Sequence, residues 1–194
     1  MITSTYNTRP LIPDSNRFIR SDAVTNITEK EKQWLIDRKI TTVFDLRTDR
    51  ERHEKPSPLA TDSRFSYTCS PVRHGSTVPA TPDDVSASYI AMIDDEFLQT
   101  IDRIMSASSN VLFFCNAGKD RSGVVSAVLL HRLGYDRAYI VDDYMKSAER
   151  LRSVLEQYLQ EHPDADRNVI TPHPAYMERF LDWFEGVFYR MVKK

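Results

Sequence analysis

A thiol and a guanidinium lie close together in one short stretch of the chain. Cys115 follows the apolar run Val111–Phe114, Arg121 directly precedes Ser122, and short or polar residues around Gly118 lie between them. The apolar run predicts a buried strand, and apolar residues at helical spacing after Ser122 predict a helix. A loop of this kind directs several backbone N–H groups inward, and the helix N-terminus adds positive potential. The stretch therefore predicts a site for a phosphate-sized anion above a nucleophile.

The same residues allow a plainer interpretation, in which a buried Cys115 ends a strand and Arg121 is only solvated. The context favours the anion site. Gly118 lets the backbone turn tightly, and Ser122 places a hydroxyl beside the guanidinium. The predicted strand and helix also flank the loop in the order that such a site needs.

The run CNAGKDRSG, from Cys115 to Gly123, resembles the phosphate-binding loop of the Cys-dependent protein tyrosine phosphatase superfamily. Its Gly-Lys-Asp-Arg core is similar to that of bacterial tyrosine and phosphoinositide phosphatases with the signature His-Cys-x-x-Gly-Lys-Asp-Arg. The resemblance implies hydrolysis of phosphomonoesters and a protein tyrosine phosphatase-like fold. One position departs from the signature: Phe114 stands where the family usually has His, which bears on how easily the thiolate forms.

The residue chemistry assigns roles within this loop. A free thiol, with a pKa near ~8.5, is a poor nucleophile at neutral pH, but the N–H cradle, the helix N-terminus and Arg121 all favour the thiolate of Cys115. That thiolate would attack phosphorus and form a phosphocysteine intermediate. Arg121 offers a planar fork that matches two phosphoryl oxygens, and Ser122 can donate to the sulfur as it leaves. The expected phosphate-binding residues are Asn116, Ala117, Gly118, Lys119 and Ser122.

A departing alkoxide or phenoxide also needs a general acid. The resemblance favours Asp120, the loop Asp of the Gly-Lys-Asp-Arg core. Asp83 and Asp84 are alternatives, because dual-specificity phosphatases typically hold their acid on a separate loop well before the Cys. These two residues also suit the first turn of a helix, where acids meet the positive end of the dipole. Asp45, at the end of a predicted strand, is a further candidate.

Lys119 places a second cation at the mouth of the loop. It could recognise an additional phosphate, as on an inositol lipid, or it could point into solvent. The five His residues have no metal-binding spacing. The proposed chemistry needs no metal, and we expect no cofactor.

Length and composition, with 41% hydrophobic and 28% charged residues, indicate a single domain over residues 1–194, which the resemblance implies is a phosphatase domain. Residues 1–16 are expected to form a polar N-terminal extension, and residues from about 140 to 194 a helical half on the same core. The net charge of −2 gives little support for a nucleic-acid partner. No apolar stretch is long enough to span a membrane, and Met1–Pro10 has no apolar signal region. Two Cys residues form no disulfide framework, so we expect a cytoplasmic protein.

Strands that alternate with helices, followed by a helical C-terminal part, predict an α/β fold with a small, mostly parallel central sheet flanked by helices. The expected strands are a short edge strand at 18–20, a strand at 41–46 whose Asp45 and Arg47 lie near the loop or in solvent, a half-buried strand at 65–69 with a packed Cys69, and the strand before Cys115. The expected helices are 28–38, a helix from Thr81, one near 97–105, the helix after the loop, one long helix over 141–158, and a last helix over about 175–191. Residues 48–62 are expected to be an exposed loop, and residues 70–82 a mobile or functional loop that could act as a lid.

We expect a phosphatase for phosphotyrosine-type substrates, with possible phosphoserine/threonine or phosphoinositide activity. Two alternatives stay open. A rhodanese-like sulfurtransferase also places a Cys between a strand and a helix, and a catalytically silent module could bind phosphate without hydrolysis. The sequence leaves open whether the substrate is a phosphoprotein or an inositol lipid, and it indicates no oligomeric state.

Overall fold

A five-stranded sheet lies at the centre of the molecule. The computed structural model describes residues 2–188. The strands follow the spatial order β1-β2-β5-β3-β4, and every neighbouring pair is parallel except β1 and β2. Their bounds are β1 Arg9–Pro10, β2 Phe18–Ser21, β3 Ile40–Asp45, β4 Ser66–Cys69 and β5 Asn110–Phe114. This arrangement confirms the predicted small, mostly parallel sheet.

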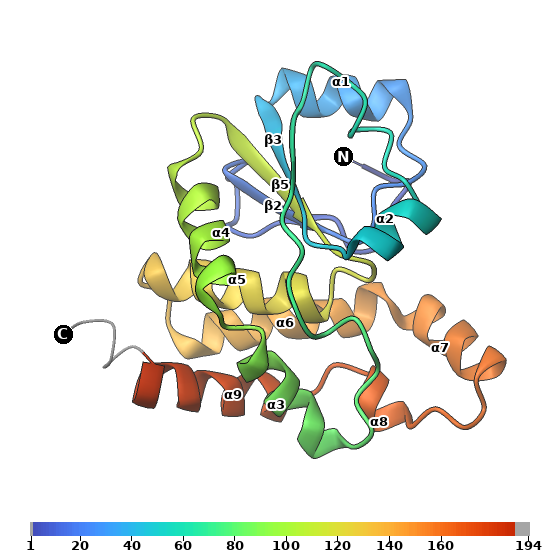
Figure 1. Ribbon diagram of the computed structural model, residues 1–194, viewed down its shortest axis with the longest axis vertical. Coiled ribbons are helices and arrows are strands. Elements are labelled where there is room, and N and C mark those ends of the chain that lie inside the picture. Colours follow the sequence, from blue (N-terminus) through green and yellow to red (C-terminus); the bar gives the residue numbers. More distant parts are fainter. Residues whose placement is uncertain (1, 189–194) are drawn as a thin grey trace.

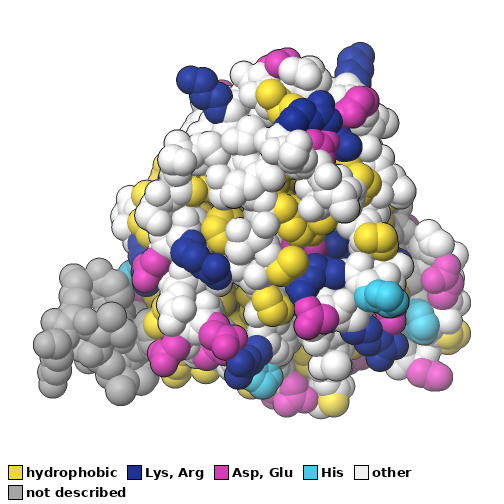
Figure 2. All heavy atoms as spheres, turned by 45° about the horizontal axis from the view of Figure 1, so that its top comes forward, with side chains coloured by type: hydrophobic (Ala, Val, Ile, Leu, Met, Phe, Trp, Pro, Cys, Tyr) yellow, Lys and Arg dark blue, Asp and Glu magenta, His cyan; other side chains and the backbone are white. Residues whose placement is uncertain are grey.

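Helices cover both faces of this sheet, α1 on one face and α4, α5 and α6 on the other (Figure 1). Their bounds are α1 Glu29–Asp37, α2 Asp49–Glu54, α3 Pro82–Ala91, α4 Asp95–Ser106, α5 Asp120–Arg132, α6 Arg137–Arg150, α7 Arg152–Glu161, α8 Arg167–Ile170 and α9 Pro174–Trp183. A π-helical turn, Phe184–Phe188, continues α9. On the face drawn in Figure 2, acidic and basic side chains are mixed. Within residues 2–188, no helix is long and apolar enough to cross a membrane.

Strand β5 is the middle strand of the sheet, and the sheet separates two apolar cores. Side chains alternate along a strand, so Phe113 packs with the core under α4, α5 and α6, while Phe114 packs with the core under α1. Both side chains are fully buried, as the continuous apolar run predicted. Cys115 returns to the side of Phe113, which is the side of α5.

Local capping signals set several helix starts. Thr28 and Glu31 form a complete capping box at α1, and Thr81 and Asp84 form another at α3. Both helices start where the sequence predicted. Gly134 follows the C-cap residue Leu133 of α5 with a φ of +83°, a conformation that glycine adopts readily and that commonly ends a helix.

Part of the N-terminal segment, expected as a polar extension, packs against the sheet and the two cores. Arg9 in β1 pairs with Arg20, so β2 lies between β1 and β5 and is not an edge strand. Ile2 and Leu11 are buried in the two cores. The polar composition of residues 1–16 hid this role because its polar side chains are buried in hydrogen bonds described below.

Two further expectations were wrong in the second half of the chain and at β4. The single helix over 141–158 is two helices, α6 and α7, which meet at Leu151. The backbone of Leu151 leaves helical geometry (φ −95°, ψ 4°) while its side chain is buried, so one apolar stripe belongs to two helices. Cys69 is exposed because β4 is the last strand of the sheet. The predicted end of the last helix, near Met191, lies outside the described residues.

Candidate active site

The loop after β5 is held from outside through its carbonyl oxygens. The backbone N–H of Ala23 donates to the carbonyl oxygen of Asn116 at 2.9 Å. The side-chain amide of Asn7 donates to the carbonyl oxygens of Ala117 at 3.1 Å and Gly118 at 3.0 Å. In a trans peptide the N–H lies opposite the carbonyl, so carbonyls bound from outside leave the following N–H groups directed into the loop. This arrangement suits the anion cradle that the sequence predicts, and the binding of an anion there stays a prediction.

A buried charge cluster adds a second outside support. The guanidinium of Arg20, in β2, donates to the carbonyl oxygen of Gly118 at 2.7 Å and also pairs with Asp143 of α6. Asp143 accepts from Arg9 Nε at 2.9 Å. Burial opposes the charge of Asp143, but Arg20 and then Arg9 lower the pKa of its carboxyl below the ordinary value. The carboxylate therefore stays ionised and holds both guanidinium groups next to the loop.

Gly118 is the point where the loop passes closest to β2. Its φ is +65°, and a Cβ at this position would lie 2.5 Å from the carbonyl oxygen of Ser21 and 2.6 Å from the backbone nitrogen of Asp22. Both obstacles are backbone atoms, which cannot rotate away. Only glycine fits this approach.

Cys115 is buried and lines a cavity of about 580 Å³. The loop lines this cavity with Cys115, Asn116, Ala117, Lys119, Asp120 and Arg121. Residues 75–79 of the predicted functional loop line it as well, so that loop does border the site. Its motion as a lid stays a prediction. Apolar residues of α7 and α8 form a further wall, with Val154, Tyr158, Val169 and Ile170.

Arg121 is held in place by Glu51. Its Nη1 lies 2.7 Å from Oε2 of Glu51 and its Nη2 lies 2.6 Å from Oε1. The Nε is buried and has no hydrogen-bond partner within residues 2–188. Glu51 thus occupies the end of the planar fork and leaves the Nε side for another anion. Burial opposes the positive charge, but Glu51 and then the attraction of Cys115 raise the pKa of Arg121 above its ordinary value.

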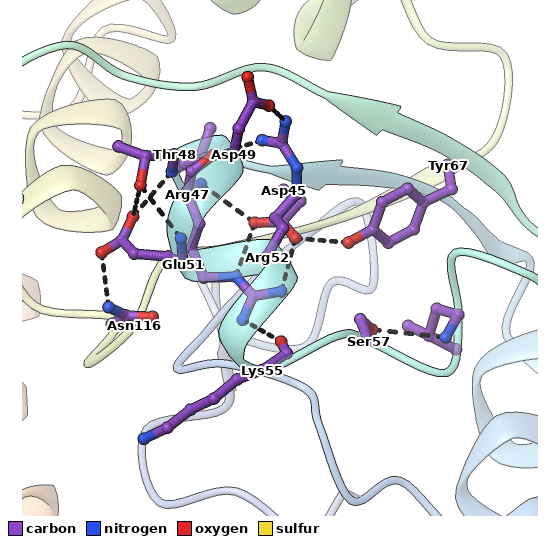
Figure 3. A network of polar contacts seen from close by, with 12 residues as sticks. Asp45, Arg47, Thr48, Asp49, Glu51, Arg52, Lys55, Ser57, Tyr67 and Asn116 are labelled. Carbon is purple, nitrogen blue, oxygen red and sulfur yellow. Dashed lines mark hydrogen bonds and ion pairs between the residues drawn. The ribbon is translucent and has the colours of Figure 1, made fainter.

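Glu51 was missed because residues 48–62 were wrongly expected to be a loop. They contain helix α2, and Glu51 forms a capping box with Thr48 at its start (Figure 3). Its carboxylate also accepts from the side-chain amide of Asn116 at 2.5 Å. Burial raises the pKa of Glu51, but the hydrogen bonds from Arg121 and Thr48 lower it by more, so the pKa lies below its ordinary value. The spacing Thr48-x-x-Glu51 was the available signal for this helix.

Asp120 is the predicted acid that the structure brings to the cavity. Its side chain is 29% exposed, and its Oδ1 accepts from the hydroxyl of Tyr89 at 2.5 Å. The Nζ of Lys119 lies 3.5 Å from Oδ2. The carboxyl group therefore has one oxygen held by a neutral donor and the other beside a cation.

The alternative acids lie elsewhere. Asp83 is exposed and pairs with Arg179 at 2.6 Å, and Asp84 serves the capping box of α3. Asp45 is fully buried in a two-point ion pair with Arg47, at 2.9 and 2.7 Å. None of the three carboxylates lines the cavity.

Asp22 is a cavity carboxylate that the sequence analysis did not consider. Its two oxygens accept from the backbone N–H groups of Tyr6 at 3.0 Å and Asn7 at 2.8 Å. Burial raises the pKa of its carboxyl, which these bonds only partly oppose. Both oxygens are thus already in use to hold the N-terminal segment, which makes Asp22 the weaker acid candidate.

Lys119 and Ser122 differ from their simplest expectations. Lys119 does not point into solvent: its Nζ donates to the carbonyl oxygen of Ile170 at 2.6 Å and the residue is 7% exposed. Recognition of an additional phosphate by Lys119 stays a prediction. The hydroxyl of Ser122 is buried and makes no hydrogen bond to any described residue, so its donation to the sulfur is also still a prediction.

Phe114 faces away from the site. Its ring lies in the core under α1, with the guanidinium of Arg47 5.1 Å from the ring centre and the ring of Tyr67 6.5 Å away. Its carbonyl oxygen accepts from Leu46 N–H at 2.9 Å. At the position before Cys115, this chain therefore has an apolar side chain that packs in the core on the other side of the sheet.

Comparisons with known proteins agree with this geometry. The model of the tyrosine phosphatase family matches residues 12–192, so the chain belongs to this family. A tyrosine-protein phosphatase from Nostoc commune is 29% identical over 147 residues, which cover 71% of this chain and 50% of that protein. The triple specificity protein phosphatase PtpB of Mycobacterium tuberculosis is 36% identical over 72 residues, which cover 36% of this chain and 26% of that protein. The matched part of the chain thus spans half or less of these relatives.

Solved structures give a weaker similarity. The structure of P. aeruginosa TpbA aligns with a TM-score of 0.46 at 15% identity, over 90% of this chain and 96% of that chain. The structure of TpbA in complex with pTyr aligns with a TM-score of 0.45 at 16% identity, over 74% and 80% of the two chains. In the described part of the chain, no group of three or more His, Cys, Asp or Glu side chains is arranged to hold a metal ion.

Proposed function

We propose that this chain hydrolyses phosphomonoesters through a phosphocysteine intermediate, with phosphotyrosine-type substrates first. The observation that supports this most is the buried Nε of Arg121, which has no hydrogen-bond partner among the described residues and belongs to a residue that lines the same cavity as Cys115. A phosphoryl group placed there would meet the thiol below and the guanidinium at its side. Because the transition state of phosphoryl transfer is loose, this positioning and charge stabilisation supply most of the catalysis.

In the first step the thiolate of Cys115 attacks phosphorus. The new S–P bond forms as the P–O bond to the leaving group breaks, and Asp120 transfers its proton to the departing oxygen. Arg121 and the loop N–H groups bind the equatorial oxygens throughout.

In the second step Asp120, now ionised, removes a proton from a water molecule. The water oxygen attacks phosphorus, the S–P bond breaks, and Cys115 leaves as thiolate. Inorganic phosphate is released, and Asp120 is protonated again for the next cycle.

Aryl phosphates fit the walls of the cavity. Tyr6 and Val78 are two of the large hydrophobic residues that are most exposed in the described chain, at 60% and 55%, and both line the cavity beside the loop. An aromatic leaving group can bury its ring against such side chains. The proposal extends to phosphoserine/threonine and phosphoinositide substrates, with Lys119 as the residue for an additional phosphate.

A panel assay tests the reaction. We expect purified protein to release phosphate from p-nitrophenyl phosphate and phosphotyrosine peptides in the presence of EDTA, and Cys115→Ser to abolish release while phosphate still binds. Acid quench after mixing with labelled substrate should trap phosphate on the wild-type protein and not on the variant. Full activity of Cys115→Ser would refute the mechanism. Binding without release by the wild type would favour the silent module, and transfer of sulfur from thiosulfate to cyanide would favour the sulfurtransferase.

The acid is tested by leaving-group dependence. Asp120→Asn should slow alkyl phosphates, which have poor leaving groups, far more than p-nitrophenyl phosphate. Asp83→Asn is the matched control, because that carboxylate is exposed and lies outside the cavity. An equal loss on both substrates in Asp120→Asn would move the role to another group, with Asp22 next.

A cytoplasmic location belongs to the same proposal. A catalytic thiolate works only while reduced, and the cytoplasm keeps thiols reduced. Inactivation by mild oxidants and recovery with dithiothreitol would support this requirement.

A further inference from the structure

A buried pair of tyrosines stands behind Asp120. Tyr89 comes from α3 and is 1% exposed, and its hydroxyl lies 2.5 Å from Oδ1 of Asp120. The hydroxyl of Tyr144, from α6, lies 2.8 Å from that of Tyr89, and the two rings meet edge to face. Side chains of three helices, α3, α5 and α6, thus form one row of hydrogen bonds from Tyr144 through Tyr89 to Oδ1 of Asp120.

The direction of these hydrogen bonds follows from the number of protons. Each tyrosine hydroxyl has one proton, and an ionised carboxylate can only accept. Tyr89 must therefore donate to Asp120, which leaves its oxygen to accept from Tyr144. Burial, and then the neighbouring Asp120, raise the pKa of Tyr89 well above its ordinary value, so the donor keeps its proton at any pH of interest.

We infer that Tyr89 is a positioning residue for the general acid: it occupies Oδ1 of Asp120, so that the transferable proton resides on Oδ2, and Tyr144 holds Tyr89 in turn. This inference rests on the proposed role of Asp120. In the protonated acid, Oδ1 is the carbonyl oxygen and accepts from Tyr89, while Oδ2–H is free to turn to the leaving oxygen. In the ionised state the same bond stabilises the carboxylate that must activate water.

Two cations also act on this carboxylate. Lys119 Nζ lies 3.5 Å from Oδ2, and Arg121 is near enough that Asp120 contributes to the raised pKa of its guanidinium. In general, a nearby cation or a hydrogen-bond donor favours the charged form of a carboxyl group. Removal of the Tyr89 hydroxyl should therefore make Asp120 a weaker acid that loses its proton at higher pH, while the two cations remain unchanged.

Tyr89→Phe tests this step and keeps the ring that packs in the core. We expect the alkaline limb of the kcat profile for an alkyl phosphate to move upward by about half to one pH unit, since a lost hydrogen bond to the charged form shifts a pKa in this direction. The rate on that substrate should fall about tenfold at its optimum, with a much smaller change for p-nitrophenyl phosphate. Tyr144→Phe should shift the limb in the same direction by less.

Tyr176→Phe is the matched control. Tyr176 is buried and its hydroxyl donates to the carbonyl oxygen of Asn168 at 2.7 Å, away from Asp120. Its pH profile should superimpose on that of the wild type. A Tyr89→Phe profile that also superimposes on the wild type, or an equal loss of rate on both substrates, would overturn the inference.

A double variant separates this inference from the proposed function. In an Asp120→Asn background, Tyr89→Phe should cause no further change in leaving-group dependence. If Asp120→Asn alone leaves that dependence unaltered, the assignment of the acid fails and the inference fails with it. If Asp120→Asn alters it and Tyr89→Phe shifts neither the profile nor the carboxyl carbon titration of Asp120 seen by NMR, only the inference fails.

Discussion

Gly118→Ala should damage both the stability and the catalytic loop of this protein. The added Cβ would lie 2.5 Å from the carbonyl oxygen of Ser21 and 2.6 Å from the nitrogen of Asp22, both of them backbone atoms. Relief of the clash requires the loop to move away from β2. That movement would also stretch the bonds that Asn7 and Arg20 make to the Gly118 carbonyl, at 3.0 and 2.7 Å.

Two costs add in this variant. A non-glycine residue in the left-handed region costs about 1–2 kcal/mol, and Gly118 has a φ of +65°. Insertion of a carbon into a packed site costs about 1–3 kcal/mol more. The free energy of unfolding should thus fall by about 2–5 kcal/mol, and since about 1 kcal/mol corresponds to roughly 3 °C in a chain of this size, Tm should fall by about 6–15 °C. A displacement of the cradle by about 1 Å should lower kcat/KM by about 100-fold.

Gly134→Ala is the matched control for the assay. Gly134 has a φ of +83°, but a Cβ there would meet no heavy atom of residues 2–188 within 4 Å. It should therefore show only the backbone cost, a Tm lower by about 3 °C for about 1 kcal/mol, with unchanged kcat/KM. Thermal unfolding and p-nitrophenyl phosphate turnover measure both quantities. If Gly118→Ala unfolds at the same temperature as Gly134→Ala and retains the wild-type rate, the close approach of the loop to β2 is wrong.

Two other carboxylates give further predictions. Glu51→Gln should lower kcat about tenfold, because the guanidinium of Arg121 loses the charged two-point partner that fixes its geometry. Steady-state kinetics measure this effect, and an unchanged kcat would contradict it. Glu31 accepts from the backbone N–H groups of Thr3 at 2.6 Å, Ser4 at 2.9 Å and Thr28 at 2.9 Å, and these bonds outweigh burial and hold the pKa of its carboxyl well below the ordinary value of 4.5. The stabilisation that the Glu31 carboxylate gives to the folded state is therefore complete above about pH 5 and is lost as the pH falls below that value. Glu31→Gln should lower the free energy of unfolding in urea by about 2–3 kcal/mol at pH 7 and by much less at pH 3. Equal losses at both pH values would refute this.

The parts of the molecule that the sequence predicted are those encoded locally. The strand, the tight loop and helix α5 are contiguous, so residue types from Val111 to Gly134 were enough to place them. Capping boxes at Thr28 and Thr81 are likewise signals within four residues. Asp120 could be placed in the loop for the same reason, although its role as the acid is still a prediction.

The parts that could not be predicted depend on partners far apart in the chain. Glu51 lies 70 positions before Arg121, and Tyr89 lies 31 positions before Asp120. Asn7 reaches the loop across 111 positions. No periodicity or spacing encodes such contacts, because they depend on which strand ends meet at the same edge of the sheet.

The non-local contacts also explain why a polar N-terminus and a charged segment belong to the folded core. A loop that directs its N–H groups inward must satisfy its carbonyl oxygens outside, and a buried carbonyl without a donor costs about 1–3 kcal/mol. Apolar neighbours cannot meet that need, so Asn7 and Arg20 are buried behind the loop, and Asp143 balances the guanidinium charge. Arg121 is a buried cation that needs an anion: Glu51 pairs with its guanidinium, while its Nε has no partner among the residues that the structure describes. The anion site is therefore a property of the whole domain: the loop provides the groups that would touch phosphate, and buried polar residues from distant segments fix their direction.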